Sequence, residues 1–167
     1  AFIFPGQGAQ FKGMVQDFCS ENESLLQIIK EAEKISNRSV TKILWETELF
    51  ELSRSDNSQL AITVASIVII NELKNRGIES DICAGFSLGE FSALYDSGVL
   101  SFEDTIKLVT ERGNIMQKVC DNLSEKSEGN LPGMMAILGL PLEQIESLIE
   151  PLSKKGIAFV ANINSPK

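Results

Sequence analysis

The chain has 167 residues, 43% of them hydrophobic and 23% charged, which is typical of a globular protein that can bury a core. Its 15 basic and 23 acidic side chains give a formal net charge of −8, so an overall basic surface for nucleic acid is excluded. The most apolar run, residues 60–70, includes Thr63 and Ser66 and is far shorter than the ~20 residues that a membrane-spanning helix requires.

The first half of the chain predicts one strand followed by helices. Residues 1–4 predict a short buried strand, and the segment from 11 to 45 predicts several short helices, with Asn22, Asn37 and Ser39 as cap or break candidates. Residues 58–76 predict a helix that is apolar almost all round and therefore buried on most sides, with Gly77 at its end.

A strand, a sharp turn and a helix are predicted next. Residues 82–84 are apolar and enter the pentapeptide GFSLG at 85–89, after which 90–97 predict a helix that stops at Gly98. A second helix is predicted from Ser101, which heads an S-x-x-D cap, to Cys120.

The polar stretch at 121–131 is the best internal boundary. We therefore expect one domain at 1–123 and the start of another at 132–167. Beyond the boundary, predicted strands at 134–138 and 157–160 flank a predicted helix at 142–152 and would form a β-α-β unit.

The pentapeptide GFSLG matches G-x-S-x-G, the pattern of a nucleophile elbow. Its glycines leave room for a strained strand-to-helix turn that would present the hydroxyl of Ser87, and the N–H of Leu88 would be an oxyanion donor. A plain Gly-Ser turn explains the pentapeptide alone equally well. Cys83 is a rival nucleophile, although its apolar strand is more typical of a small core residue.

Four segments occur in order along the chain, FPGQGAQ at 4–10, GFSLGE at 85–90, RGNIMQ at 112–117 and ANINSP at 161–166. Together they resemble the malonyl-CoA:acyl carrier protein transacylases and related synthase acyltransferase domains. The resemblance implies an α/β-hydrolase-like large subdomain with an inserted ferredoxin-like small subdomain, both incomplete in this chain. Residues 1–123 would form the first part of the large subdomain, and residues 132–167 the first part of the small subdomain.

The resemblance also implies a reaction. Ser87 would take malonyl from coenzyme A as an ester and pass it to the phosphopantetheine thiol of acyl carrier protein, for fatty acid biosynthesis. Coenzyme A thioester would be a substrate, and no metal or bound cofactor is implied. Gln7 and Leu88 would serve the oxyanion hole, while Arg112, Met116 and Asn162 would bind substrate.

Arg112 has two interpretations. Helical spacing places it in a row with Leu108, Ile115 and Val119, which we expect to face inward, and a buried cation needs an anion. That anion is either Glu90 or Glu111 in a structural ion pair, or the free carboxylate of malonyl, which the RGNIMQ match favours.

Two departures from the family pattern stand out. Phe86 occupies the place of a histidine in many members, and we expect its ring to point away from the hydroxyl of Ser87. The chain contains no histidine at all, so we expect the catalytic histidine of the family beyond Lys167. Alternatives are another serine esterase or thioesterase, or a non-catalytic module without a base.

Partners and location follow from composition and resemblance. We expect malonyl-CoA and acyl carrier protein as partners, no nucleic acid and no membrane, and a monomer. Three widely spaced cysteines without a CxxC pair suggest neither a disulfide framework nor a zinc site. This fits the cytoplasm, or an organelle if a presequence has been removed.

Overall fold

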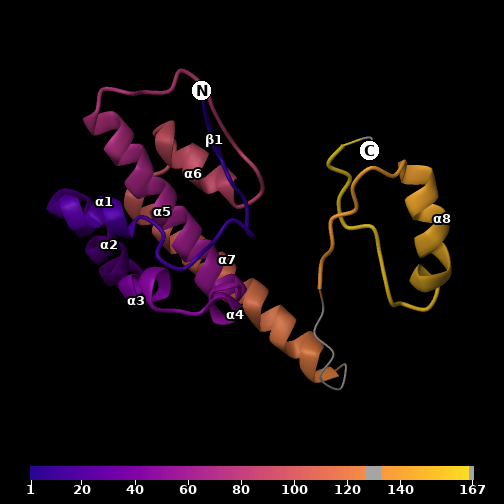
Figure 1. The fold of residues 1–167 in the computed structure, drawn as a ribbon. Helices are drawn as coiled ribbons and strands as arrows, with labels where there is room; N and C mark the ends of the chain where they lie inside the picture. The colour runs from indigo at the N-terminus through magenta and orange to yellow at the C-terminus, as the bar shows by residue number, and fades with distance from the viewer. Residues whose placement is uncertain (127–132, 166–167) are drawn as a thin grey trace. The chain divides into compact units, whose positions relative to one another are not determined.

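The computed structural model describes residues 1–126 and 133–165, which fall into two compact units, Ala1–Leu131 and Pro132–Lys167. Unit 1 holds both strands of the described residues and most of the helices (Figure 1). Within the described ranges, no helix is both long enough and apolar enough to cross a membrane.

Unit 1 begins with a strand and a group of short helices. The strand β1 spans Phe2–Phe4, and the helices that follow are α1 (Gln16–Glu21), α2 (Glu23–Ser36), α3 (Val40–Trp45) and α4 (Leu49–Leu52). Asn22 caps α2 by accepting a hydrogen bond from the Ser24 N–H, and Asn37 ends it in the left-handed conformation. The predicted short helices and two of their cap candidates are therefore confirmed.

The helix α5 (Ser55–Asn75) is the centre of unit 1. Leu60, Val64, Ile67 and Val68 are completely buried, because α2, α3, α6 and α7 all pack against this helix. Gly77 follows α5 with a φ of 74°, and the Ile78 N–H donates to the Leu73 carbonyl, as in a glycine-terminated helix. The prediction of a helix buried on most sides is confirmed.

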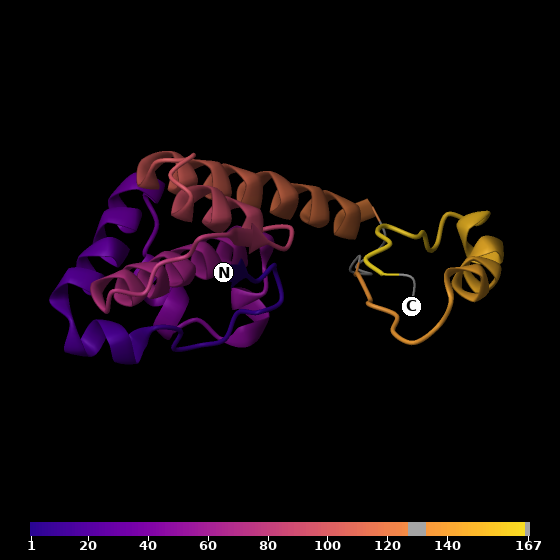
Figure 2. The same ribbon diagram turned by 90° about the horizontal axis from the view of Figure 1, so that it is seen from above.

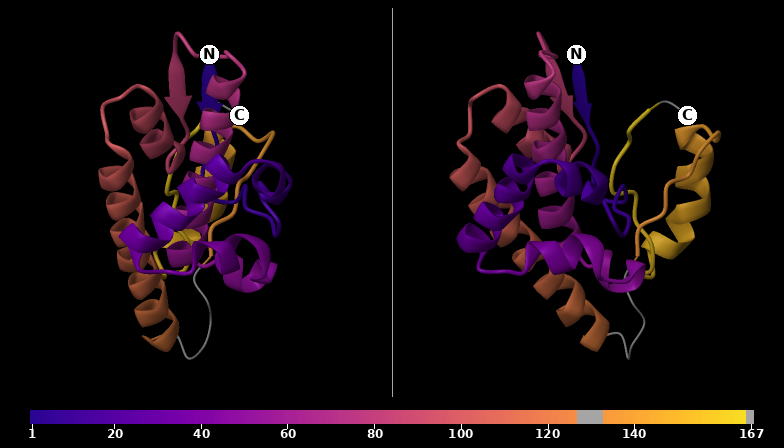
Figure 3. Two further views of the ribbon diagram at one scale, coloured as in Figure 1. Left: turned by 90° about the vertical axis from the view of Figure 1, so that its left-hand side faces the viewer. Right: turned by 60° about the vertical axis from the view of Figure 1, so that its left-hand side comes forward.

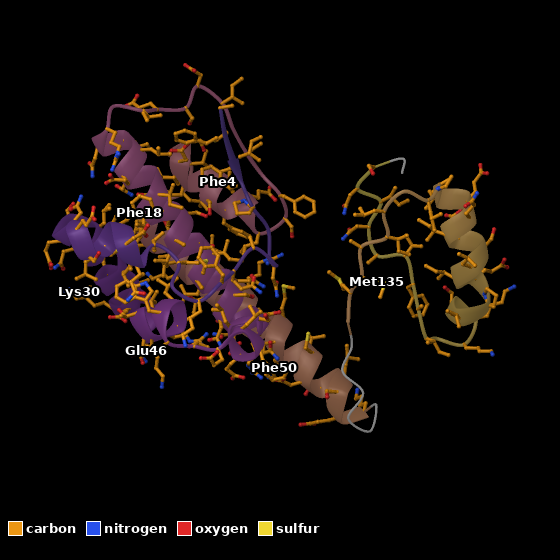
Figure 4. All side chains as sticks on the ribbon, in the orientation of Figure 1. Phe4, Phe18, Lys30, Glu46, Phe50 and Met135 are labelled. Atoms are coloured by element: carbon orange, nitrogen blue, oxygen red, sulfur yellow. The ribbon has the colours of Figure 1, made fainter. Side chains whose placement is uncertain are left out.

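The second half of unit 1 returns to the first strand. The strand β2 (Cys83–Gly85) pairs in parallel with β1, with Phe2 opposite Cys83 and Phe4 opposite Gly85. The helix α6 (Gly89–Asp96) follows at once, and Figure 3 shows β1 and β2 lying side by side. Phe4, labelled in Figure 4, packs against Ile70 of α5 and Ala93 of α6.

The helix α7 (Phe102–Lys126) runs along α5 (Figure 2). Ser101 caps it as predicted, because its hydroxyl accepts from the Asp104 N–H over 3.0 Å. The helix extends six residues past the predicted end at Cys120, so the polar segment from Asp121 begins as helix. Residues 127–131 of the expected boundary lie outside the described residues.

Unit 2 contains the helix α8 (Leu142–Ser153), close to the predicted 142–152. The strands expected at 134–138 and 157–160 are not formed, so the β-α-β prediction is wrong in its strands. A strand exists only through hydrogen bonds to a neighbouring strand, and these two segments make none in the part of the chain described. Together, the parallel pair and its helices make the described chain an α/β protein.

Candidate functional site

The carboxyl ends of β1 and β2 lie next to each other, and each strand leads into a tight turn. The Phe86 N–H donates to the Phe4 carbonyl over 3.0 Å, which extends the pairing by one residue. Gly6 lies so close to Phe86 that an added Cβ would be 2.8 Å from its carbonyl oxygen. Loops at this end of parallel strands are the usual place for ligands in α/β proteins.

Ser87 stands at the tip of the turn between β2 and α6. Its φ of 51° lies in the left-handed region, which a non-glycine residue adopts at a cost of roughly 1 kcal/mol or more. The residue is exposed, and its hydroxyl has no hydrogen-bond partner among the described residues. The strand, turn and helix predicted around GFSLG are therefore confirmed, and the turn has the strained backbone that was expected.

Two glycines make this turn possible. A Cβ on Gly85 would collide with the backbone of Gly89 and Glu90, and a Cβ on Gly89 would collide with the carbonyl of Phe4. The glycines of the pentapeptide are therefore required by the close approach of α6 to both strands.

The N–H of Leu88 has no acceptor in the described part of the chain. The neighbouring donors are used, since the Gly89 N–H reaches the Phe86 carbonyl and the Glu90 N–H the Ser87 carbonyl. Leu88 is 1% exposed as a whole residue, and its side chain belongs to the core around α5. A free N–H at the start of a helix can stabilise negative charge on a substrate oxygen.

Gln7 lies in the turn after β1, exposed, and its amide Nε2 donates to the hydroxyl of Ser55 over 3.3 Å. Ser55 begins α5, and its own N–H donates to the side-chain oxygen of Gln117 on α7 over 2.8 Å. The start of α5 thus connects the first predicted motif to the third. The close approach of α7 depends on Gly113, where a Cβ would be 2.9 Å from the Ser55 carbonyl oxygen.

The guanidinium of Arg112 donates through Nη1 to the side-chain oxygen of Gln59 over 2.6 Å. It also lies over the ring of Phe91, with its central carbon 5.7 Å from the ring centroid. Phe91 lies on α6, four residues after Ser87, so the ring connects the guanidinium to the helix that follows the serine. Met116 accepts a 3.1 Å hydrogen bond at sulfur from the Gln59 amide.

The predicted inward row of α7 is wrong. Leu108, Ile115 and Val119 are 46%, 56% and 51% exposed, whereas the buried residues of α7 are Thr105, Ile106, Val109 and Gly113. At about 100° per residue, Arg112 lies between these two faces and is half-buried. The apolar spacing alone could not show which side of α7 the other helices of unit 1 cover.

The structural ion pair that was the alternative interpretation of Arg112 is not formed. Neither Glu90 nor Glu111 is within ion-pair distance, and no other carboxylate in the described ranges pairs with this guanidinium. Its hydrogen-bond partner is a neutral amide and its platform is an aromatic ring. The positive charge therefore remains available to a bound anion.

The remaining predicted residues behave differently. Asn162 is exposed and belongs to unit 2, whereas Ser87 belongs to unit 1. The thiol of Cys83 donates to the Ala93 carbonyl over 3.3 Å inside the small core around β2.

Another cysteine, Cys19, is buried in the core of unit 1. Burial, with a contribution from the charge of Asp17, raises the pKa of Cys19 to about 11, which keeps this thiol protonated at neutral pH.

Gln59 and Phe91, like Ser55, are residues of this site that the sequence did not single out. Gln59 is the last of five polar residues that begin α5 and directly precedes the apolar run at 60–70, and this position beside the apolar run could have identified it. Phe91 resembles any other apolar residue of its helix, and nothing in the sequence distinguishes it.

Comparisons with known proteins agree on one family. The family model described as the acyl transferase domain matches residues 1–130. The malonyl CoA-acyl carrier protein transacylase of Bacillus subtilis (strain 168) is 34% identical over 167 residues, which cover 99% of this chain and 50% of that protein. The corresponding protein of Staphylococcus aureus (strain MSSA476) is 35% identical, covering 99% of this chain and 51% of its own length.

A solved structure has a similar fold. The crystal structure of MCAT from Streptococcus pneumoniae has a TM-score of 0.78 and 34% identity, covering 99% of this chain and 52% of that chain. The chain thus spans about half the length of the relatives that it matches. Because the family model matches well over half of its residues, this chain belongs to the acyl transferase domain family.

Proposed function

We propose that the protein transfers malonyl from coenzyme A to the phosphopantetheine thiol of acyl carrier protein, with Ser87 as the nucleophile of an elbow turn. The family and the names of its relatives support a malonyl acyltransferase of fatty acid biosynthesis. The strained, exposed turn at Ser87 supports the choice of this residue.

One observation carries the choice of acyl group. The guanidinium of Arg112 lies over Phe91, four residues after Ser87, and makes no ion pair in the described part of the chain. A guanidinium can bind a carboxylate with two parallel hydrogen bonds, and malonyl has a free carboxylate separated from its thioester carbon by a single methylene group. A simple ester substrate would leave this charge without a function.

The proposed reaction has two acyl transfers. In the first, the Ser87 oxygen bonds to the thioester carbon, the carbon–sulfur bond breaks, and coenzyme A leaves with the proton of the hydroxyl. In the second, the thiol of the carrier protein attacks the ester, and Ser87 recovers its proton. The Leu88 N–H and Gln7 would stabilise the oxyanion of each step, and the base would be a histidine outside these 167 residues.

We also propose further residues of the substrate site, a subdomain architecture, an oligomeric state and a cellular location. Met116 and Asn162 would complete the substrate site. We propose an α/β-hydrolase-like large subdomain at 1–123 and the start of a ferredoxin-like small subdomain at 132–167, supported by the similarity to the solved transacylase. The protein would act as a monomer in the cytoplasm, without a bound metal or cofactor.

The test is acylation of Ser87 in the protein at its full natural length. After mixing with malonyl-CoA, intact-mass spectrometry should find one malonyl group on the unaltered protein and none on Ser87→Ala, since the accepting oxygen is gone. Ser97→Ala is the matched control, because Ser97 is an exposed serine at the other end of α6, and it should be acylated normally. Full acylation of Ser87→Ala would place the nucleophile elsewhere.

The same sample separates transfer from hydrolysis. With acyl carrier protein present, malonyl should leave the enzyme for the carrier thiol faster than it appears as free malonate. The reverse order would identify a hydrolase that uses the same elbow turn.

A further inference from the structure

Gln59 is a polar side chain that is completely buried and uses both ends of its amide. It is 0% exposed on α5, and its oxygen accepts from Nη1 of Arg112 over 2.6 Å. Its nitrogen donates to the sulfur of Met116 over 3.1 Å. Burying an amide is costly unless it is hydrogen-bonded, so both contacts restrict the position of this side chain.

The partner that Gln59 provides for the guanidinium is neutral. An aspartate or glutamate at this place would also orient Arg112, but it would cancel the positive charge and occupy the donors that a carboxylate ligand needs. An amide oxygen takes one donor of the five on the guanidinium and leaves the charge intact. Among the described residues, no other hydrogen bond to this guanidinium competes with a ligand.

A second contact to the guanidinium comes from α6. The ring of Phe91 lies 5.7 Å from its central carbon, so the group is in contact with both α5 and α6. Two-point fixation of this kind preorganises a charged group and lowers the entropy lost when a ligand binds. The fixation comes from α5 and α6, neither of which carries Arg112 itself.

We propose that Gln59 is a positioning residue that holds Arg112 as an unneutralised receptor for a carboxylate, and so sets the preference for acyl groups that carry one. The proposal rests on the proposed function and adds a residue to it. Gln59 does not touch the reacting atoms. Its effect is on the choice between malonyl and acetyl, which differ by one carboxylate.

The experiment replaces Gln59 by Glu or Met in the protein at its full natural length. Gln59→Glu keeps the shape and the accepting oxygen but adds a negative charge beside Arg112. Gln59→Met keeps a similar volume and removes the acceptor. For both, kcat and KM are measured with malonyl-CoA and acetyl-CoA, together with Tm.

We expect the acetyl-to-malonyl ratio of kcat/KM to rise about tenfold or more in Gln59→Glu, the effect of losing one charge-assisted hydrogen bond. The rise should come through KM for malonyl-CoA, with acetyl transfer nearly unchanged. Gln59→Met should shift the ratio in the same direction by a smaller factor, because the guanidinium loses its anchor and keeps its charge.

Thr63→Val is the matched control. Thr63 is also completely buried on α5, one turn beyond Gln59, and its hydroxyl has no hydrogen-bond partner within the described ranges. This variant should leave the ratio unchanged. If Gln59→Glu does not fold, the acetyl-to-malonyl ratio of Gln59→Met still tests the proposal, since this variant introduces no buried charge.

Two outcomes overturn the inference and can be told apart. If the unaltered protein forms a malonyl-enzyme but both Gln59 variants lose malonyl and acetyl transfer equally, with a lower Tm, Gln59 is a structural residue. If the unaltered protein forms no malonyl-enzyme, the proposed function itself is wrong, and this inference fails with it.

Discussion

Arg112 shows how the surroundings of one residue decide what its charge can do. A half-buried cation is usually paired with a carboxylate, which satisfies it and makes it a structural element. Here the neighbours are an amide and an aromatic ring, both of which hold the guanidinium without cancelling its charge. At the residue scale, the site is therefore prepared for an anion that comes from outside the described chain.

Replacement of Arg112 by Ala should cut malonyl transfer by ~10²-fold or more, the scale of losing a charge-assisted pair worth roughly 3 kcal/mol. Transfer of acetyl should fall little or rise, because acetyl has no carboxylate to lose. Arg112→Lys should be intermediate, since an ammonium keeps the charge but lacks the planar fork. Steady-state kinetics with the two coenzyme A thioesters measure the ratio, and equal losses for both acyl groups would show a structural role.

At the scale of elements, the turn that presents Ser87 depends on how closely α6 approaches the two strands. The backbone of Gly89 touches the carbonyl of Phe4, and that of Gly85 touches the first turn of α6. Strands of only three residues can hold this geometry because α5 and α6 pack against them.

Gly89→Ala should destabilise the protein by ~1–3 kcal/mol or more, because the new methyl group would collide with the Phe4 carbonyl and push α6 away from β1. Acylation of Ser87 should fall with it. Gly133→Ala is the matched control, since a Cβ there meets nothing within 4 Å and should leave stability nearly unchanged. Urea unfolding gives both values, and equal midpoints for the two variants would contradict the packing argument.

At the scale of the whole molecule, burial is distributed unequally between the two units. The core of unit 1 gathers around α5, whereas none of the described residues of unit 2 is buried, including those of α8. The exposed rows on α7 and α8 carry large apolar side chains, such as Leu108 and Leu148. The stability of the described chain therefore comes from unit 1.

A peptide covering residues 133–165 should show no cooperative thermal transition by circular dichroism. A 12-residue helix is marginal in water, and this one has no buried side chain to support it. A helix-promoting alcohol should raise its helicity gradually, which is the control for helix propensity. A sharp melting transition in plain buffer would show that unit 2 folds without further partners.

The sequence by itself determined the features that depend on local chemistry. The strand, turn and helix around Ser87, the cap at Ser101 and the stop at Gly77 follow from residues within a few positions of each other, because glycines and capping hydroxyls act on their own backbone. The four motifs were enough to indicate the acyl transferase family, which the family model confirms.

Tertiary structure decided the features that depend on neighbours distant in sequence. The contact of Gln59 with Arg112 joins residues 53 positions apart, and the buried face of α7 is fixed by α5 and not by the apolar spacing of α7. The same reason explains the two unformed strands of unit 2, since a strand needs the backbone of a partner. Local sequence patterns determine backbone conformation, but packing decides which side chains meet. The charge of Arg112 stays unpaired because packing brings an amide and an aromatic ring to it, and no carboxylate of the described residues.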